Sequence, residues 1–183
     1  MINSRKDITL AYNTMVKVNR FEQNKDPNYF ESNSFYTNCG SYAFNLVRWY
    51  NPDEAFDQDD IELGYQLIER EGFSEEEVIQ ILFERDVEQI LKDFNVTMVD
   101  NKNYPLAENE ELIAFRIGIN RDFFDDDALI IDQHFRVKRN GKWFEKCGCS
   151  GVHEVKDYNE KPWMISAELI YWGPIAYFVK KCF

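Results

Sequence analysis

The chain has no apolar run near the roughly 18 residues that a helix needs to cross a bilayer. Its first residues, Met1 to Asp7, lack the apolar core of a secretory signal. Internal repeats, low-complexity tracts and linkers are absent as well, and 183 residues suit a single domain over residues 1–183. We therefore expect a soluble protein made in the cytosol, with no signal peptide and no membrane partner, although export by another route stays open.

Positive charge is scarce, since Lys and Arg number 21 against 33 Asp and Glu, which gives a formal net charge of −12. Affinity for nucleic acids comes mostly from cations that replace the counterions of the phosphates. The charge balance therefore argues against a nucleic-acid partner. A partner with a basic surface and mimicry of nucleic acid remain as functional explanations, and an acidic surface also keeps a protein soluble.

The sequence lacks a phosphate-binding glycine motif and a nucleotide fingerprint, so we expect no cofactor. Its four cysteines, Cys39, Cys147, Cys149 and Cys182, have no spacing that indicates a disulfide framework. In a cytosolic chain of this size we expect them to be reduced.

Patterns typical of helices come first along the chain, and patterns typical of strands follow. The apolar spacing predicts helices over residues 39–50, 59–71 and 74–94. Pro52 and Gly72 end the first two, and Ser74 with Glu77 forms a capping box for the third. Strands are expected at 96–99, 112–117, 129–138, 142–147 and 175–180, and Asn140-Gly141 is typical of a two-residue hairpin turn.

This order predicts an α+β fold in which N-terminal helices, one of them starting at the cysteine, pack on a C-terminal antiparallel sheet. Residues 1–37 would form an N-terminal extension with a short strand or helix near 8–18. Residues 38–94 would form the helical part and residues 95–183 the sheet part. The aromatic residues expected to pack in the core are Trp143, Trp163, Tyr171, Trp172, Tyr177 and Phe178.

Cys39 stands where the first helix is expected to begin, directly after the good N-cap residue Asn38. A thiol in the first turn lies beside unpaired backbone N–H groups and the positive end of the helix dipole. Both favour the thiolate, so the position predicts a reactive nucleophile. The alternative is a small buried hydrophobic residue, as most free cysteines are.

The chain has two histidines, and His134 lies in an alternating stretch that leads into the Asn140-Gly141 turn. A tight turn there sets the register of the hairpin, in which Val137 faces Phe144 and Arg136 faces Glu145 as an ion pair. The same register brings His134 opposite Cys147 and Asp132 opposite Cys149. His134 would then project from the sheet with Asp132 two residues before it on the same face.

A cysteine at a helix start and a histidine on an antiparallel sheet are the groups that a thiol hydrolase needs. Histidine takes the thiol proton and returns it to the leaving group, a third polar residue orients the ring, and N–H donors hold the oxyanion. We assign Cys39 as nucleophile, His134 as base, Asp132 as orienting residue, and the Cys39 amide with the Asn38 side chain as oxyanion donors. For the orienting residue, Glu145 and Asn159 stay open.

Four segments together resemble a papain-like family of phage and bacterial proteins: Asn38-Cys39 with Tyr42-Ala43-Phe44, Asp132-Gln133-His134-Phe135, Gly141-Lys142-Trp143 and Lys146-Cys147-Gly148. In that family an Asn-Cys helix start precedes an Asp-x-His-aromatic strand and a Gly-x-Trp hairpin. The broader similarity is to CHAP-type amidases, which cut peptide bonds in cell-wall material. The resemblance implies a papain-like fold with Cys39 as nucleophile and His134 as base, acting on a peptide or protein substrate.

The hairpin departs from the family pattern. Phe144 and Glu145 stand where the family usually has a further histidine, Cys147 stands where it tends to have proline, and the turn is shorter by a residue. The catalytic pair is kept, but the substrate contacts are altered. The alternative is therefore a non-catalytic, degenerate relative, a phage virion or accessory protein that binds another protein in a phage assembly.

A zinc site is the rival interpretation of the same region. Cys147, Cys149 and His153 are metal-capable, and His134 across the hairpin would be a fourth ligand. Zinc there would compete with catalysis, because His134 cannot serve both purposes. Two packed thiols and a surface histidine in a glycine-rich loop are the simpler interpretation.

Overall fold

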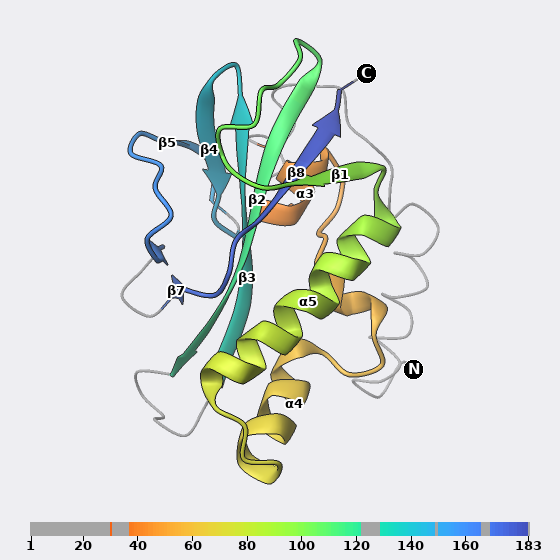
Figure 1. The fold of residues 1–183 in the computed structure, drawn as a ribbon, viewed down its shortest axis with the longest axis vertical. Coiled ribbons are helices and arrows are strands. Elements are labelled where there is room, and N and C mark those ends of the chain that lie inside the picture. The colour runs from red at the N-terminus through yellow and green to blue at the C-terminus, as the bar shows by residue number, and fades with distance from the viewer. Residues whose placement is uncertain (1–29, 31–36, 122–128, 149, 166–168, 183) are drawn as a thin grey trace, which may run out of the picture.

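The structure, a computed structural model, describes residue 30 and residues 37–121, 129–148, 150–165 and 169–182. Within these ranges helical elements precede strands, as the sequence predicts, and the class is α+β (Figure 1). The region near 8–18 and Cys149 lie outside the described residues. Among the described residues, none of the helices combines the length and the hydrophobicity that a membrane span requires.

The helical elements are α3 (Cys39–Phe44), η2 (Pro52–Ala55), α4 (Asp60–Tyr65), the π-helical turn η3 (Gln66–Arg70) and α5 (Glu75–Asp93). The strands are β1 (Val96–Val99), β2 (Glu110–Arg121), β3 (Leu129–Arg139), β4 (Lys142–Lys146), β5 (Val152–Val155), β6 (Trp163–Met164), β7 (Ile170–Tyr171) and β8 (Ala176–Lys181). Six of them form an antiparallel sheet in the order β1-β8-β2-β3-β4-β5, and β6 pairs with β7.

The first helix is shorter than predicted, because α3 ends at Phe44 rather than near Tyr50. Asn45 adopts a left-handed conformation with φ 58° and closes the helix. Tyr50 is buried all the same, since its ring packs against Phe44 and Phe94 in an aromatic cluster. The apolar spacing of residues 46–50 therefore reflects packing of an irregular segment, not a continued helix.

The third helix follows the prediction at its start. The Ser74 hydroxyl accepts from the Glu77 N–H at 3.3 Å, and the Glu77 carboxylate accepts from the Ser74 N–H at 2.9 Å. Before it, Gly72 ends the preceding helical segment with a φ of 76°. Both signals are local, so the sequence identifies them without knowledge of the rest of the fold.

The central hairpin has the predicted register near its turn, but in the described residues the pairing stops at Arg136, so the predicted pairing of His134 with Cys147 is not formed, and Cys149 lies outside the described residues. Arg136 pairs with Glu145 and Val137 with Phe144, while Asn140 and Gly141 have φ angles of 49° and 79°, as a type I′ turn requires. The predicted strands are all present, and β2 runs longer than expected. The short strands β5, β6 and β7 were not predicted from the sequence.

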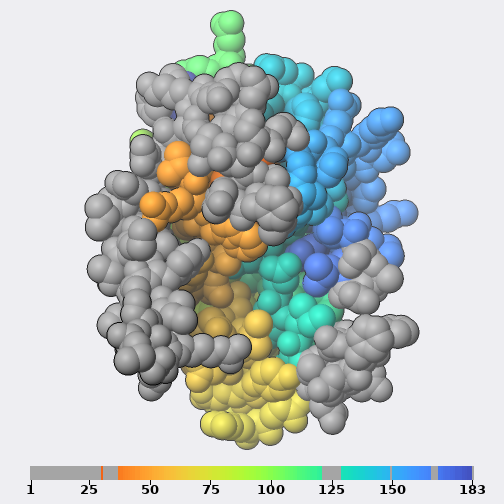
Figure 2. Space-filling model, turned by 180° about the vertical axis from the view of Figure 1, so that it is seen from behind, coloured from red at the N-terminus to blue at the C-terminus, as the bar shows by residue number. Residues whose placement is uncertain are grey.

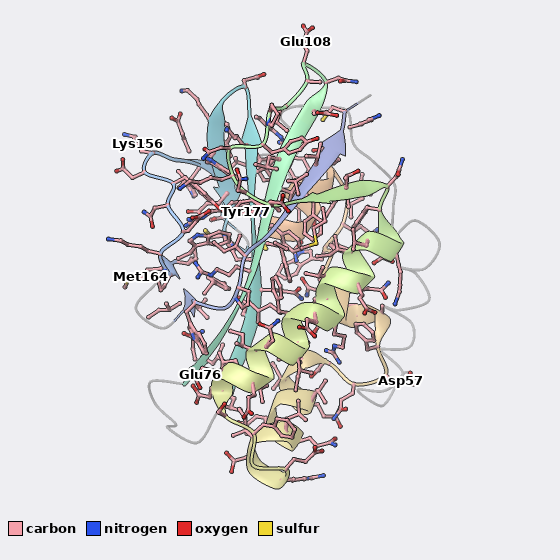
Figure 3. The ribbon with its side chains drawn as sticks, in the orientation of Figure 1. Asp57, Glu76, Glu108, Lys156, Met164 and Tyr177 are labelled. Carbon is pink, nitrogen blue, oxygen red and sulfur yellow. The ribbon has the colours of Figure 1, made fainter. Side chains whose placement is uncertain are left out.

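The helices cover one face of the sheet, and their apolar side chains fill the space against it (Figure 3). The opposite face carries a second apolar cluster that includes Trp143, Trp163, Tyr171 and Tyr177. Phe135 faces the helices, and His134, its neighbour along β3, faces the second cluster and stacks on Tyr171. The two groups of the predicted catalytic pair therefore reach one another only if the helix start lies at an edge of β3.

Candidate active site

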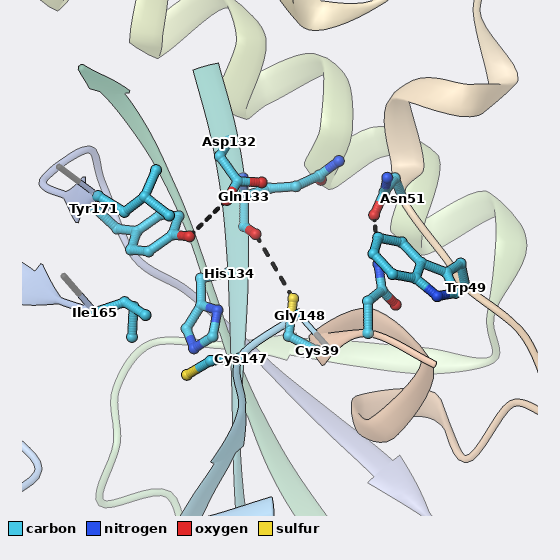
Figure 4. Close-up of a pocket in the computed structure, with 12 residues that line it drawn as sticks. Cys39, Trp49, Asn51, Asp132, Gln133, His134, Cys147, Gly148, Ile165 and Tyr171 are labelled. Atoms are coloured by element: carbon cyan, nitrogen blue, oxygen red, sulfur yellow. Dashed lines mark hydrogen bonds between the residues drawn. The ribbon is translucent and has the colours of Figure 1, made fainter. Parts of the chain in front are cut away.

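A pocket of about 340 Å³ lies where the start of α3, β3 and the segment around β7 meet (Figures 2 and 4). Figure 2 shows these three segments side by side, in orange, teal and dark blue. The pocket is lined by Asn38, Cys39, Trp49, Asn51, Asp132, Gln133, His134, Cys147, Gly148, Ile165, Leu169 and Tyr171. The structure thus brings together all four residues that the sequence predicts for catalysis.

The edge of β3 explains how Cys39 enters this pocket. Strand β2 pairs with β3 from Leu129 to Lys138, whereas β4 pairs with it only from Arg136 onwards in the described residues. Beyond that point the start of α3 takes the place of β4, and the Cys39 Sγ donates to the carbonyl oxygen of Gln133 at 3.6 Å (Figure 4). The thiol therefore occupies the unpaired strand edge, beside the residue that precedes His134.

The side chain of Asn38 anchors the start of α3. Its Oδ1 accepts from the Ser41 N–H at 2.9 Å and from the Tyr50 N–H at 3.1 Å. Its Nδ2 donates to the Tyr50 carbonyl at 3.0 Å and to the Asn51 side chain at 2.6 Å. The predicted oxyanion role of Asn38 is therefore wrong, because both of its amide protons are already engaged in holding the backbone.

Two buried or half-buried cations hold the other end of α3. The Lys180 Nζ donates to the Ala43 carbonyl at 2.8 Å, and the Arg139 guanidinium donates to the Tyr42 carbonyl at 3.1 Å. Cations at a helix C-terminus satisfy carbonyl groups and complement the dipole. A helix of only six residues is thereby fixed at its start by its own N-cap residue and at its end by side chains from distant segments.

His134 is oriented by Glu145. The imidazole is 2 % exposed, and its Nε2 lies 3.2 Å from the Glu145 Oε2, which also accepts from the Arg136 Nε at 2.7 Å. The ring stacks on Tyr171 with centroids 5.0 Å apart. Asn159, the other alternative from the sequence, instead bonds the Asp157 carbonyl and the Lys161 N–H.

Asp132 does not contact the imidazole, so its predicted role as orienting residue is wrong. Its Oδ2 accepts from the Tyr171 hydroxyl at 2.7 Å, and its Oδ1 accepts from the Gln133 N–H at 2.8 Å. Residues two apart on a strand share a face, but their side chains project in parallel. His134 therefore finds its partner across the hairpin, and Asp132 finds its partner on β7.

Gly118 makes room for β7 at this point. It lies opposite Asp132 in the sheet, and a Cβ built on it would lie 2.2 Å from the Ile170 carbonyl oxygen and 2.9 Å from the Tyr171 Cα. The absence of a side chain lets the β7 backbone lie directly on β2. Gly118 and Tyr171 were not predicted as site residues, and no short-range signal in the sequence indicates their role.

The environment of Cys39 favours the neutral thiol. Burial, followed by the nearby charge of Asp132, raises the pKa of Cys39 to about 12. The expectation that the helix start lowers this pKa is therefore wrong, because the thiol is only 6 % exposed and α3 is short. At rest the S–H group donates to Gln133, and Cys39 has no hydrogen bond to His134 within the described part of the chain.

Glu145 has the opposite behaviour. Burial works to raise its pKa, but the hydrogen bonds and charges of His134 and Arg136 outweigh burial and lower the pKa of Glu145 to about 2. The carboxyl is therefore ionised at neutral pH. An ionised partner holds the imidazole ring in place and stabilises the imidazolium form once the ring has taken a proton.

Only part of the zinc site proposed as the rival interpretation is assembled in the described residues. The ligand atoms of His134, Glu145 and Cys147 lie within 4.8 Å of one another. However, Arg136 already occupies Glu145, and burial, then the charge of Glu145, raises the pKa of the Cys147 thiol to about 11. His153 is exposed on β5. A structural zinc ion needs four ligands, usually thiolates or imidazoles, so the described residues do not fit it well.

Behind the pocket lies a group of buried carboxyls. The Gln133 side chain donates to the Asp53 Oδ1 at 2.9 Å, and Asp60 and Asp86 lie close by, with Arg85 bonded to Asp60. Burial, then the charge of Asp53, raises the pKa of Asp60 to about 7. Burial, then the charges of Asp60 and Asp53, raises the pKa of Asp86 well above its ordinary value.

These carboxyls predict how stability depends on pH. Between pH 4 and 7, roughly, the folded chain binds protons that the unfolded chain does not, so the free energy of unfolding should rise as the pH falls. Glu145 acts in the opposite sense, because its contribution is lost as the pH falls below its ordinary pKa of 4.5 towards about 2. Asp86→Asn should flatten the rise and stabilise the protein near neutral pH by about 1–2 kcal/mol. Urea unfolding at several pH values measures this.

The exposed Glu84, on the same helix as Asp86, provides the control. Glu84→Gln should leave the pH dependence as it is in the wild type. An unchanged slope in Asp86→Asn would contradict the assignment of bound protons to this group.

No protein-family model matches the chain, and neither a curated protein nor a solved structure is significantly similar to it. The function is therefore inferred from the pocket itself.

Proposed function

We propose that the protein is a papain-like cysteine hydrolase that cleaves a peptide or amide bond with Cys39 as nucleophile and His134 as base. The observation that carries the proposal is that the candidate nucleophile and the candidate base meet at one pocket. Cys39 and His134 both line it, and His134 is held by the ionised carboxylate of Glu145. Nucleophile, base and orienting group in this order form the arrangement that thiol hydrolases use.

The reaction begins from a neutral thiol. Cys39 turns from Gln133 towards His134, which takes the thiol proton as the sulfur attacks the substrate carbonyl carbon. The oxyanion is held by the Cys39 N–H, which has no partner within a helix because it belongs to the first turn. His134 then protonates the leaving amine, and a water activated by the same ring hydrolyses the acyl-enzyme.

Glu145 assists both halves of this cycle. While His134 carries a proton, the ring is an imidazolium beside a carboxylate whose other partner is Arg136. The attraction between imidazolium and carboxylate lowers the energy of the charged intermediate state. The stack of His134 on Tyr171 keeps the ring plane fixed between the two proton transfers.

The second candidate function is a non-catalytic one, a degenerate phage virion or accessory protein that binds another protein. The burial of Cys39 favours it, since the thiol is 6 % exposed and donates to a backbone carbonyl at rest. In that case Cys39 stabilises the strand edge, and the pocket has no chemical role.

The rate of alkylation of Cys39 separates the two candidates. Iodoacetamide treatment across the pH range, followed by peptide mass mapping, gives the rate for Cys39 alone among the four cysteines. In a hydrolase, His134→Ala should lower this rate near neutral pH by about tenfold or more, because a thiol with a pKa of about 12 depends on a nearby base to take its proton during the attack. The control is His153→Ala, which removes the other histidine of the chain and should change little.

Equal rates in the wild type and His134→Ala would contradict the catalytic pair and favour the non-catalytic candidate. A Cys39 that reacts only after unfolding would do the same, because a nucleophile must be reachable from the pocket.

A further inference from the structure

We infer that Asp132 binds a primary ammonium group of the substrate, so that the enzyme cleaves an amide bond close to an amine. This inference rests on the proposed hydrolase function and names its substrate class. The ammonium group belongs to a lysine-type side chain or to a free α-amino terminus, and the two sources present the same chemistry to a carboxylate.

The charge of the pocket carries the inference. Among the described residues that line the pocket, twelve in all, Asp132 is the one carboxylate, and none of the twelve is a lysine or arginine. Within the described residues, Asp132 has no salt bridge to a cation. A half-buried carboxylate in a pocket attracts a cationic ligand, because the low dielectric of the walls strengthens the interaction.

The nearby cations are already engaged. Arg136 binds Glu145 at 2.7 Å, and the Lys146 Nζ donates to the Thr37 carbonyl at 2.6 Å. Arg116 donates to backbone carbonyls, among them that of Gly173 at 2.6 Å. In the part of the chain that the structure describes, these cations bind other groups, and a ligand can supply a positive charge to Asp132.

The hydrogen bonds of Asp132 prepare it for this role. Both known donors, the Tyr171 hydroxyl and the Gln133 N–H, are neutral and fix the carboxylate without cancelling its charge. A carboxylate has about four acceptor positions, so two directions remain for an ammonium group. Figure 4 shows the carboxylate of Asp132 on the same side of β3 as the His134 ring.

The walls of the pocket suit an amine on an apolar stem. Trp49, Ile165 and Leu169 line the pocket together with Asp132. An apolar pocket with one placed charge selects ligands that combine methylene groups with one opposite charge. A free amino terminus next to a hydrophobic residue meets the same requirement.

A bound ammonium group would also help the chemistry. The charge of Asp132 is, after burial, the second cause of the high pKa of Cys39. An ammonium group at Asp132 cancels part of this effect and makes the proton transfer from Cys39 to His134 easier. Binding of the correct substrate thereby promotes ionisation of the nucleophile.

The first test uses charged thiol reagents and needs no turnover. Cationic aminoethyl, neutral methyl and anionic sulfonatoethyl methanethiosulfonates are applied to the whole protein, and modification of Cys39 is followed by mass mapping. We expect the cationic reagent to react about tenfold faster than the anionic one after correction for their intrinsic rates. Asp132→Asn should abolish most of this preference and keep the hydrogen bond from Tyr171.

The matched control is Asp157→Asn, which removes one negative charge at an exposed position and should keep the preference. A preference that is the same in Asp132→Asn and in the wild type would overturn the inference. That result would leave the hydrolase proposal standing, since the effect of His134→Ala is measured separately.

The second test identifies the source of the amine with coumarylamide substrates. Three substrates are compared. Blocked lysine carries its positive charge on the side chain, norleucine with a free α-amino group carries it at the amino terminus, and blocked norleucine carries none. Faster cleavage of the lysine substrate than of blocked norleucine supports a side-chain amine, and faster cleavage of free norleucine supports an amino terminus. Equal cleavage of all three would overturn the inference.

Discussion

Replacing Glu145 by glutamine should lower the rate of peptide hydrolysis by about 10²–10⁴-fold while the protein stays folded. Glutamine has nearly the size of glutamate, so the contacts of the hairpin remain. It removes the negative charge that stabilises the protonated ring of His134, and it can present an N–H group where the ring needs an acceptor. The rate is measured with the best coumarylamide substrate, together with the rate of Cys39 alkylation.

The matched control for this change is Glu154→Gln. Glu154 lies on the neighbouring strand β5 and forms an exposed ion pair with Lys142 at 2.9 Å. Exposed ion pairs contribute little to stability, so this variant should hydrolyse at the wild-type rate. Normal hydrolysis by Glu145→Gln would show that His134 does not depend on this carboxylate, and the proposed triad would be wrong.

Gly118→Ala should destabilise the protein by about 2–3 kcal/mol and displace Tyr171 from the pocket. The new Cβ would lie 2.2 Å from the Ile170 carbonyl oxygen, and the obstacle is backbone rather than a flexible side chain. Strand β7 has to move away from β2, which breaks the hydrogen bond to Asp132 and the stack on His134. Urea unfolding measures the stability, and hydrolysis should fall with it even where the protein is still folded.

Gly141→Ala is the comparison for this prediction. Gly141 has open space around it, so a Cβ there meets no atom within 4 Å, although its φ of 79° disfavours alanine. A loss of about 1 kcal/mol is expected from the backbone alone, with no effect on the pocket. A Gly118→Ala protein that is as stable and active as the wild type would contradict the described packing of β7 on β2.

The sequence predicted those features that depend on residues close together in the chain. The Ser74–Glu77 capping box and the Asn140-Gly141 turn each need fewer than six residues. The Asn140-Gly141 turn also fixes the register of the hairpin, which places Arg136 opposite Glu145. The partner of His134, Glu145, lies on the opposite strand of this same hairpin. The prediction chose Asp132 instead, because Asp132 is two residues away on the same strand.

Other features could not be predicted, because they depend on segments that meet only in the folded chain. The position of Tyr171 follows from the missing side chain of Gly118, more than 50 positions earlier, and from the pairing of β6 with β7. The pKa of Cys39 depends on burial by β3, and burial outweighed the effect of the helix start. The dipole of the helix start can be predicted from neighbouring residues, whereas the burial of the Cys39 sulfur depends on residues that are distant in the sequence.

The short helix α3 has a consequence for the order in which the protein acquires its structure. Its carbonyl at Ala43 is held by Lys180, 137 positions later, and Cys39 itself contacts Gln133, 94 positions later. A six-residue helix does not persist alone in water. Cys39 therefore reaches the position seen in the fold only after β3 and β8 have joined the sheet, so the pocket forms late in folding.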